Sequence, residues 1–146
     1  MLMFKHLFLA LCFCWLAAFN ASGQHKLHIT VTNLKGKGPV YIAIYNRADD
    51  FGKPHKAYRK LIKPSSDKVL TATAEDLPAG DYAVAIYQDL NENKKIDKNM
   101  LGIPTEPFGF SNNVRPVVSA PTFKQCKVVI DKSEKSISII LDTYHL

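Results

Sequence analysis

Short segments in which apolar and polar residues alternate predict β-strands along most of the chain. The alternation is clearest near the beginning, where Leu27, Ile29 and Val31 alternate with His28 and Thr30. A period of two puts successive side chains on opposite faces of a strand, so one face is expected to be buried. The strands predicted from alternating or continuous apolar residues cover residues 27–31, 40–45, 69–74, 82–87, 126–130 and 137–141, with a further short strand at 57–62.

These strands, with no helical period longer than two turns, predict an all-β fold, an antiparallel β-sandwich of about seven strands. Segments 40–45 and 82–87 are apolar on both faces, which is typical of central strands. Ser133 and Glu134 are expected to close a hairpin between the last two strands.

Two stretches interrupt the regular spacing of the predicted strands. Residues 46–67 are polar and basic, and residues 88–124 form a long connection between two strands. Loops longer than about 15 residues are uncommon in compact domains and are usually functional or disordered. This connection contains Phe108, Phe110 and Phe123. We therefore expect one long ordered loop that its aromatic side chains attach to the sandwich.

Residues 1–23 have the pattern of a cleaved secretory signal peptide. Lys5 and His6 precede a continuous apolar run over residues 7–19, which is shorter than the roughly 20 residues that span a bilayer. Small residues follow up to Gly23, after which we expect cleavage, with an uncleaved anchor as the alternative. A single β-sandwich domain over residues 24–146 would then be exported to the periplasm, the cell surface or the medium, without spanning the membrane.

The composition of the 146 residues, with 47% hydrophobic and 22% charged, excludes a disordered or collagen-like chain and allows one domain. Removal of residues 1–23 leaves Cys126 as the single cysteine, so no internal disulfide is expected and the core alone must hold the fold. Cys126 falls on the apolar face of a predicted strand and is expected to be an inert buried thiol.

Oxygen-bearing side chains recur at the spacing of a calcium-binding loop just after the strand at 82–87. Asp89, Asn91, Asn93 and Asp97 occupy relative positions 1, 3, 5 and 9, and the backbone carbonyl of Lys95 would fill position 7. The match to such a loop is incomplete: position 6 is Lys94 and position 12 is Met100, and Glu106 would have to fold back as a third carboxylate. Calcium is the predicted cofactor, with Asp89, Asn91, Asn93, Lys95, Asp97 and Glu106 as its ligands and ordering of the long loop as its role.

Two alternatives account for the same residues without calcium. In the first, Asn91 and Asn93 hold the loop through Asx-type hydrogen bonds and no metal binds. In the second, Asp89, Asp97 and Glu106 supply a carboxylate pair for glycan hydrolysis. We expect no catalytic residues and a protein that is not an enzyme, because nothing in the sequence shows these carboxylates facing each other across a cleft.

The chain has a net charge of +6 at pH 7, and one basic stretch in it suits an acidic partner. It contains Lys53, His55, Lys56, Arg59, Lys60 and Lys63. It is either a solvated loop or a contact for an acidic glycan or lipid headgroup outside the cytoplasm. The predicted export argues against nucleic acid as a partner.

A long motif connects these segments to a known family. Residues 77–86 read Leu-Pro-Ala-Gly-Asp-Tyr-Ala-Val-Ala-Ile, the Asp89-to-Asp97 loop follows, and residues 101–113 read Leu-Gly-Ile-Pro-Thr-Glu-Pro-Phe-Gly-Phe-Ser-Asn-Asn. The chain resembles the exported bacterial proteins grouped as domain of unknown function 2141. Gln88 stands where that family usually has histidine, and Lys94 where it usually has glycine. The resemblance implies export and a transthyretin-like or immunoglobulin-like sandwich, and it implies no established activity.

The sequence therefore predicts an exported, non-enzymatic module that binds an envelope glycan or protein through the 88–124 loop and the basic stretch. The alternatives are a structural envelope protein without a ligand and the glycan hydrolase described above.

Overall fold

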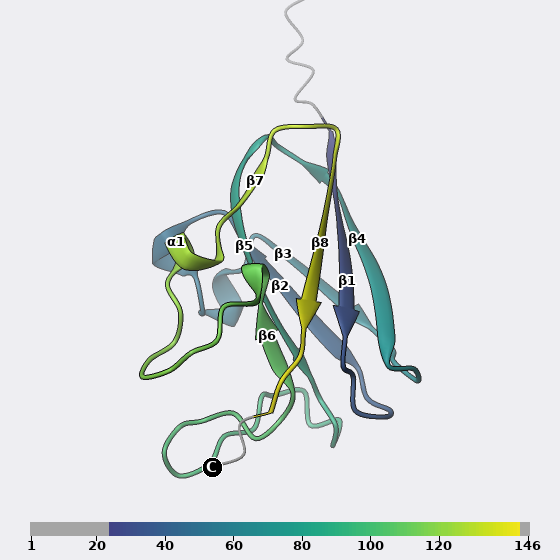
Figure 1. The fold of residues 1–146 in the computed structure, drawn as a ribbon, viewed down its shortest axis with the longest axis vertical. Helices are drawn as coiled ribbons and strands as arrows, with labels where there is room; N and C mark the ends of the chain where they lie inside the picture. Colours follow the sequence, from purple (N-terminus) through teal and green to yellow (C-terminus); the bar gives the residue numbers. More distant parts are fainter. Residues whose placement is uncertain (1–23, 144–146) are drawn as a thin grey trace, which may run out of the picture.

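Eight strands form two sheets in the computed structural model, which describes residues 24–143 (Figure 1). The smaller sheet has the order β4 (Val69–Leu77), β1 (His25–Thr32) and β8 (Glu134–Ile140). The larger sheet has the order β3 (Arg59–Lys63), β2 (Val40–Tyr45), β5 (Gly80–Gln88) and β6 (Phe108–Phe110), and β7 (Val128–Ile130) also pairs with β5. This confirms the predicted all-β, sandwich-like fold.

The helices of the described residues are short. They are η1 (Ala48–Asp50), η2 (Pro54–Lys56), η3 (Ser111–Asn113) and α1 (Phe123–Cys126). Within residues 24–143 no helix has the length and apolar character needed to cross a bilayer. The predicted signal peptide, residues 1–23, lies outside the described residues.

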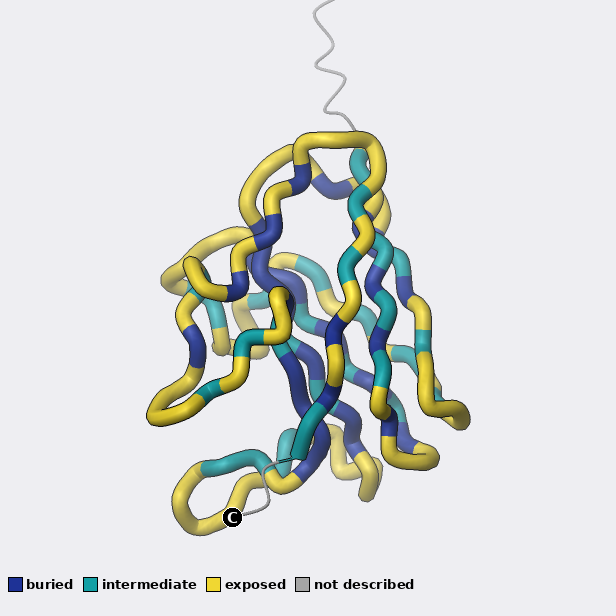
Figure 2. The backbone as a smooth tube through the Cα atoms, viewed as in Figure 1, coloured by how far each residue is buried: buried dark blue, intermediate teal, exposed yellow. Residues whose placement is uncertain are grey.

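The hydrophobic core lies between the two sheets, where their apolar faces meet (Figure 2). Leu27, Ile29 and Val31 of β1 are at most 1% exposed, as their alternation predicts, and they pack with Val40 and Ile42 of β2. Burial of one such side chain stabilises the folded state by about 1.5–3 kcal/mol, so this core can hold the domain without a disulfide.

The prediction that every pair of strands is antiparallel is wrong for β1 and β8, which run parallel. The predicted hairpin through Ser133 and Glu134 is also wrong, because β7 pairs with β5 of the larger sheet whereas β8 joins the smaller one. The short connection between β7 and β8 crosses between the sheets at the end where β1 begins (Figure 1). There the backbone N–H of Lys26 donates to the carbonyl of Ser133 (2.8 Å), so β8 starts beside the start of β1 and runs the same way.

Two further boundaries differ from those predicted. The 88–124 segment contains a strand of its own, β6, which pairs with the end of β5. Cys126 ends the single turn α1 rather than beginning a strand, because a capping box between Thr122 and Gln125 starts a helix there. The predicted burial of Cys126 is confirmed, since its side chain is 0% exposed.

Burial raises the pKa of the Cys126 thiol to about 11 from an ordinary value of 9.0. An unfolded thiol would ionise near the lower value while the folded one stays protonated, so this contribution to stability is present below pH 9.0 and lost as the pH rises toward about 11. The free energy of unfolding of the wild type should therefore decrease between pH 9.0 and about 11, and Cys126→Ala should remove this part of the decrease. Urea unfolding at several pH values between these two measures it. Folded wild-type protein should resist thiol-labelling reagents near neutral pH, and rapid labelling without unfolding would contradict the buried thiol.

Candidate functional site

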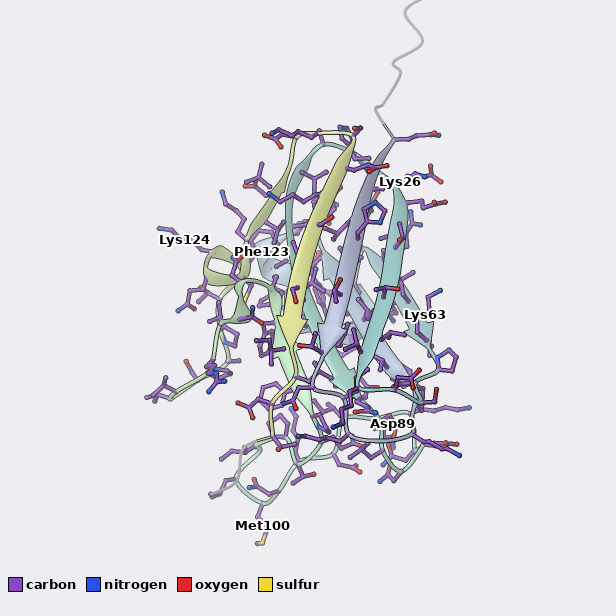
Figure 3. The ribbon with its side chains drawn as sticks, turned by 45° about the vertical axis from the view of Figure 1, so that its right-hand side comes forward. Lys26, Lys63, Asp89, Met100, Phe123 and Lys124 are labelled. Carbon is purple, nitrogen blue, oxygen red and sulfur yellow. The ribbon has the colours of Figure 1, made fainter. Side chains whose placement is uncertain are left out.

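The predicted oxygen ligands lie at the start and end of the β5–β6 connection, which we define as residues 89–107. Asp89 directly follows β5 (Figure 3). Its carboxylate is fully buried and accepts hydrogen bonds from two backbone N–H groups, those of Asn93 (3.2 Å) and Lys94 (2.7 Å). Hydrogen bonds to an ionised acceptor are about twice as strong as neutral ones. Asp89 therefore closes the first turn of the connection, in which Glu92 and Lys94 both have a positive φ.

Glu106 is the second buried carboxylate, 5% exposed, and it joins the two limbs of the connection. One oxygen accepts from the backbone N–H of Leu90 (2.8 Å) and the other from that of Asp97 (3.0 Å). Glu106 thus folds back onto the Asp89 segment as the sequence predicts, but its bonds go to the backbone.

The carboxylate of Asp97 is hydrogen-bonded to both asparagines of the loop, Asn91 and Asn93. It accepts from Asn91 Nδ2 (2.6 Å) and from Asn93 Nδ2 (2.9 and 3.0 Å). The amide oxygens of Asn91 and Asn93 accept from the backbone N–H two residues later, that of Asn93 (3.2 Å) and that of Lys95 (2.9 Å). These are Asx-type turns, and Lys95 takes part in them through its N–H. The arrangement has the contacts of the metal-free loop.

A calcium ion would need at least six oxygens directed at one point. Here Asn91 and Asn93 direct their amide nitrogens at Asp97, and the oxygens of Asp89 and Glu106 are occupied by backbone donors. Among residues 24–143, no three His, Cys, Asp or Glu side chains are grouped closely enough to hold a metal ion. Calcium binding stays a prediction from the sequence spacing, and the hydrogen bonds account for the order of the loop without it.

The β1–β2 turn packs against the start of the β5–β6 connection. Gln88, fully buried at the end of β5, accepts from the backbone N–H of Lys35 (2.7 Å) and donates to the carbonyl of Gly36 (3.2 Å). A Cβ atom on Gly38 would lie 2.3 Å from the carbonyl oxygen of Asp89, so only glycine fits there. Gln88 therefore acts as both donor and acceptor to hold a neighbouring turn.

The Ser-Asn-Asn motif after β6 joins three elements. The buried Ser111 hydroxyl accepts from the backbone N–H of Val84 in β5 (2.9 Å) and donates to the carbonyl of Cys126. Asn112 donates to the carbonyls of Gln125 (3.0 Å) and Lys127 (2.9 Å). This end of the long connection is thereby attached to α1 and β5.

Asn113 extends the same attachment to the other sheet. Its amide donates to the carbonyl of Ser138 (3.2 Å) and accepts from the backbone N–H of Ile140 (2.8 Å), both in β8. The motif is visible in the sequence, but its structural role depends on elements that lie far apart along the chain.

Sequence reasoning missed the outer face of the larger sheet. Tyr41 of β2 lies directly opposite Tyr87 of β5, and their rings are stacked in parallel with centroids 4.8 Å apart. Both tyrosines are half-buried, although the apolar pattern of their strands predicts burial on both sides. Two residues along, at a spacing of about 7 Å, the next row across the sheet has small side chains at its centre, Ala43 and Ala85.

The ends of that second row bring together the two stretches singled out in the sequence. Ala43 pairs with Lys60 of β3, in the basic stretch, and Ala85 pairs with Phe110 of β6, in the 88–124 segment. Phe51 packs edge-on against Phe110 with ring centroids 6.1 Å apart and closes one end of this face. We define the outer face by Tyr41, Ala43, Lys60, Ala85, Tyr87 and Phe110.

Members of the basic stretch differ in how far they are paired. Lys56 forms an ion pair with Asp50 (3.7 Å), and Lys53 donates to the carbonyl of Asp49 (2.8 Å). Lys60 is exposed and forms no ion pair with any described residue. The positive charge at the edge of the outer face is therefore available to a ligand.

Burial, together with Tyr41, Asp89 and Glu106 nearby, raises the pKa of Tyr87 to about 12. A tyrosine with the ordinary pKa of 10.0 is already neutral at physiological pH, so this shift only keeps the phenol of Tyr87 protonated to a higher pH.

The described chain is an all-β, sandwich-like domain with one long, hydrogen-bonded connection. It belongs to the family described as an uncharacterized protein conserved in bacteria (DUF2141), whose model matches residues 29–138. The resemblance inferred from the sequence motifs is thereby confirmed. A search of curated proteins and a search of solved structures each found no match.

The buried carboxylate of Glu106 should be a main source of stability for the β5–β6 connection. Glu106→Ala leaves the backbone N–H groups of Leu90 and Asp97 without their acceptor, and we expect the free energy of unfolding to fall by about 2–4 kcal/mol in urea titrations. Hydrogen exchange at those two amides should accelerate. Glu92→Ala, at an exposed position of the same connection, is the control and should change stability by about 0.5 kcal/mol or less. Equal effects of the two substitutions would contradict the role of Glu106.

Proposed function

We propose that this protein is an exported, non-enzymatic binding module, built on a transthyretin-like or immunoglobulin-like sandwich, whose ligand surface is the outer face. The observation that carries the proposal is the row from Lys60 through Ala43 and Ala85 to Phe110, with the stacked pair Tyr41 and Tyr87 beside it. Half-buried aromatic side chains on a rigid sheet supply contact area with little loss of side-chain entropy. The basic stretch and the 88–124 segment border this same face.

An acidic glycan is the ligand that fits this surface best. The apolar faces of sugar rings pack well on aromatic and methyl groups, and the alanines leave room between the larger side chains. The phenol of Tyr87 and the ammonium of Lys60 are donors that suit sugar hydroxyls and carboxylates. Aromatic contacts flanked by an unpaired cation thus support a polymer of uronic acids over a neutral glycan.

Export supports the choice of an envelope polymer as the ligand. The pattern of residues 1–23 is that of a secretory signal peptide, and Cys126 is the single cysteine of the remaining chain. A core that needs no disulfide would fold equally well in an oxidising compartment.

Binding of polygalacturonate should depend on Lys60 and the tyrosine pair. We expect Lys60→Glu to weaken binding about tenfold or more in isothermal titration calorimetry, because attraction for a carboxylate becomes repulsion. Tyr41→Ala should weaken binding as well, whereas Tyr41→Phe, which keeps the ring, should largely retain it.

The matched control is Lys132→Glu, which makes the same change in charge at an exposed position of the β7–β8 connection. It should bind like the wild type, and neutral dextran should bind to none of the proteins. If Lys60→Glu and Lys132→Glu lose equal affinity, the binding depends only on the net charge of the protein and not on the outer face. A wild-type protein without affinity for acidic glycans would favour the structural envelope protein instead. Turnover of the polymer that is lost in a Glu106→Gln variant that still melts like the wild type would establish the hydrolase.

We further propose that hydrogen bonds order the β5–β6 connection without calcium. A calcium site that binds only the folded protein would add roughly 2.7 kcal/mol of stability at free metal 100-fold above its dissociation constant. We expect the melting temperature to be the same in millimolar calcium and in chelator. A clear rise with calcium that disappears in Asp97→Ala would overturn this proposal and restore Asp89, Asn91, Asn93, Lys95, Asp97 and Glu106 as ligands.

A further inference from the structure

We propose that the loop end of the sandwich docks on an anionic lipid surface, with Met100 and Leu101 inserted among the lipid headgroups. The loop end comprises the β1–β2 turn (residues 33–39), the β3–β4 turn (residues 64–68) and the β5–β6 connection. This surface shares no residue with the outer face, and the proposal does not depend on glycan binding.

The topology brings these three segments to one end of the molecule (Figure 1). Backbone hydrogen bonds join them: the N–H of Leu34 donates to the carbonyl of Lys68 (3.2 Å), and the N–H of Asp89 donates to that of Pro39 (2.9 Å). Lys37, Ser66 and Glu92, one from each segment, line a common shallow hollow. The loop end is therefore one connected surface.

Cations dominate the loop end. Its exposed lysines are Lys35, Lys37, Lys68, Lys94, Lys95 and Lys98. None of these lysines forms an ion pair with a described residue. The exposed acids there are Asp67 and Glu92, because Asp89 and Glu106 are buried and the half-buried Asp97 is held by two asparagine amides. Exposed lysines consequently outnumber exposed acids on the surface that a partner would meet.

An ordered apolar tip projects from this basic surface. Met100 is 104% exposed and Leu101 77% exposed, and Met100 points away from the body of the protein (Figure 3). Asn99 organises the tip, since its side-chain oxygen accepts from the backbone N–H groups of Leu101 (3.0 Å) and Ile103 (3.0 Å). Lys98 and Pro104 pair across its base. A hydrogen-bonded turn thus keeps the side chains of Met100 and Leu101 exposed to solvent.

A lipid surface fits this combination better than a protein. A stable protein interface buries about 800 Å² on each partner, which a convex tip of two side chains does not offer. Insertion into headgroups needs no complementary pocket, and membrane affinity combines buried apolar area with attraction of nearby lysines to anionic lipids. The exposed lysines of the loop end supply the positive charge that such a surface attracts.

Vesicle co-sedimentation of the full chain tests the proposal. Wild-type protein should bind vesicles of mixed phosphatidylglycerol and phosphatidylcholine, bind them less as salt increases, and bind pure phosphatidylcholine weakly. The double variant Met100→Ser, Leu101→Ser should bind at least about tenfold more weakly. Lys94→Glu with Lys95→Glu should abolish the preference for anionic lipid.

The matched control is Val117→Ser with Val118→Ser, which removes an equally exposed apolar pair (93% and 97%) from another loop and should bind like the wild type. All variants should melt like the wild type, because the substituted side chains are exposed. Lys60→Glu should leave vesicle binding unchanged, which separates this proposal from the glycan surface. Unchanged binding by the Met100 and Leu101 variant would overturn the proposal. Concentration-dependent dimers that this variant loses would overturn it in favour of a second copy of the chain.

Discussion

The long central strand β5 needs hydrogen-bond partners along its whole length, and much of the structure follows from how the chain supplies them. One edge of β5 is covered by β2. The other edge is shared by β6 and β7, two strands of three residues each that are separated in sequence by the Ser-Asn-Asn motif and α1. Between them the Ser111 hydroxyl takes the place of a backbone acceptor for Val84. A buried backbone N–H without a partner would cost about 1–3 kcal/mol, so this serine completes the sheet.

The same attachment explains why so long a connection is ordered. Once β6 pairs with the end of β5, residues 89–107 form a closed loop whose two ends lie together. Asp89 and Glu106, at the two ends, then reach the backbone donors of the loop and satisfy them with charged acceptors. Gly109 allows β6 to lie close to β8, because a Cβ atom on this residue would lie 2.8 Å from the carbonyl oxygen of Ile140. The connection is rigid because both of its ends are fixed to the sandwich.

Periodicity predicts the strands that contribute whole rows to the core, such as β1 and β2, because burial of one face leaves a pattern in the sequence. It does not reveal β6, whose three residues lie in a segment rich in glycine and proline and alternate too briefly. Periodicity also predicts that β7 and β8 form one hairpin, because strands joined by a short turn usually pair with each other. In the structure β8 instead pairs with β1 as an edge strand of the smaller sheet.

The candidate sites, like the strands, have some features that the sequence predicts and others that it does not. The spacing of Asp89, Asn91, Asn93, Asp97 and Glu106 correctly places these residues together in the β5–β6 connection. It cannot tell which atoms face one another, because an asparagine amide presents either an oxygen or a nitrogen and the backbone competes for every carboxylate. The outer face escapes detection for a different reason: Tyr41 and Tyr87 belong to apolar runs, and a run does not distinguish a buried face from a half-exposed aromatic one.

The two ends of the domain differ in how their charged side chains are paired. At the end opposite the loop end, two cations form ion pairs, Lys26–Glu75 (3.3 Å) and Lys127–Asp81 (2.9 Å). At the loop end the oxygens of the buried carboxylates Asp89 and Glu106 accept from backbone N–H groups, so the lysines form no ion pairs with them. Exposed lysines without ion pairs among the described residues therefore lie at the loop end, and Lys60 adds another at the β3 edge. A polarised molecule of this kind is oriented as it approaches an anionic surface, because the attraction grows fastest for the face that carries the unpaired cations. Approach with the loop end forward would leave the outer face, which lies along the side of the sandwich, open to a second ligand.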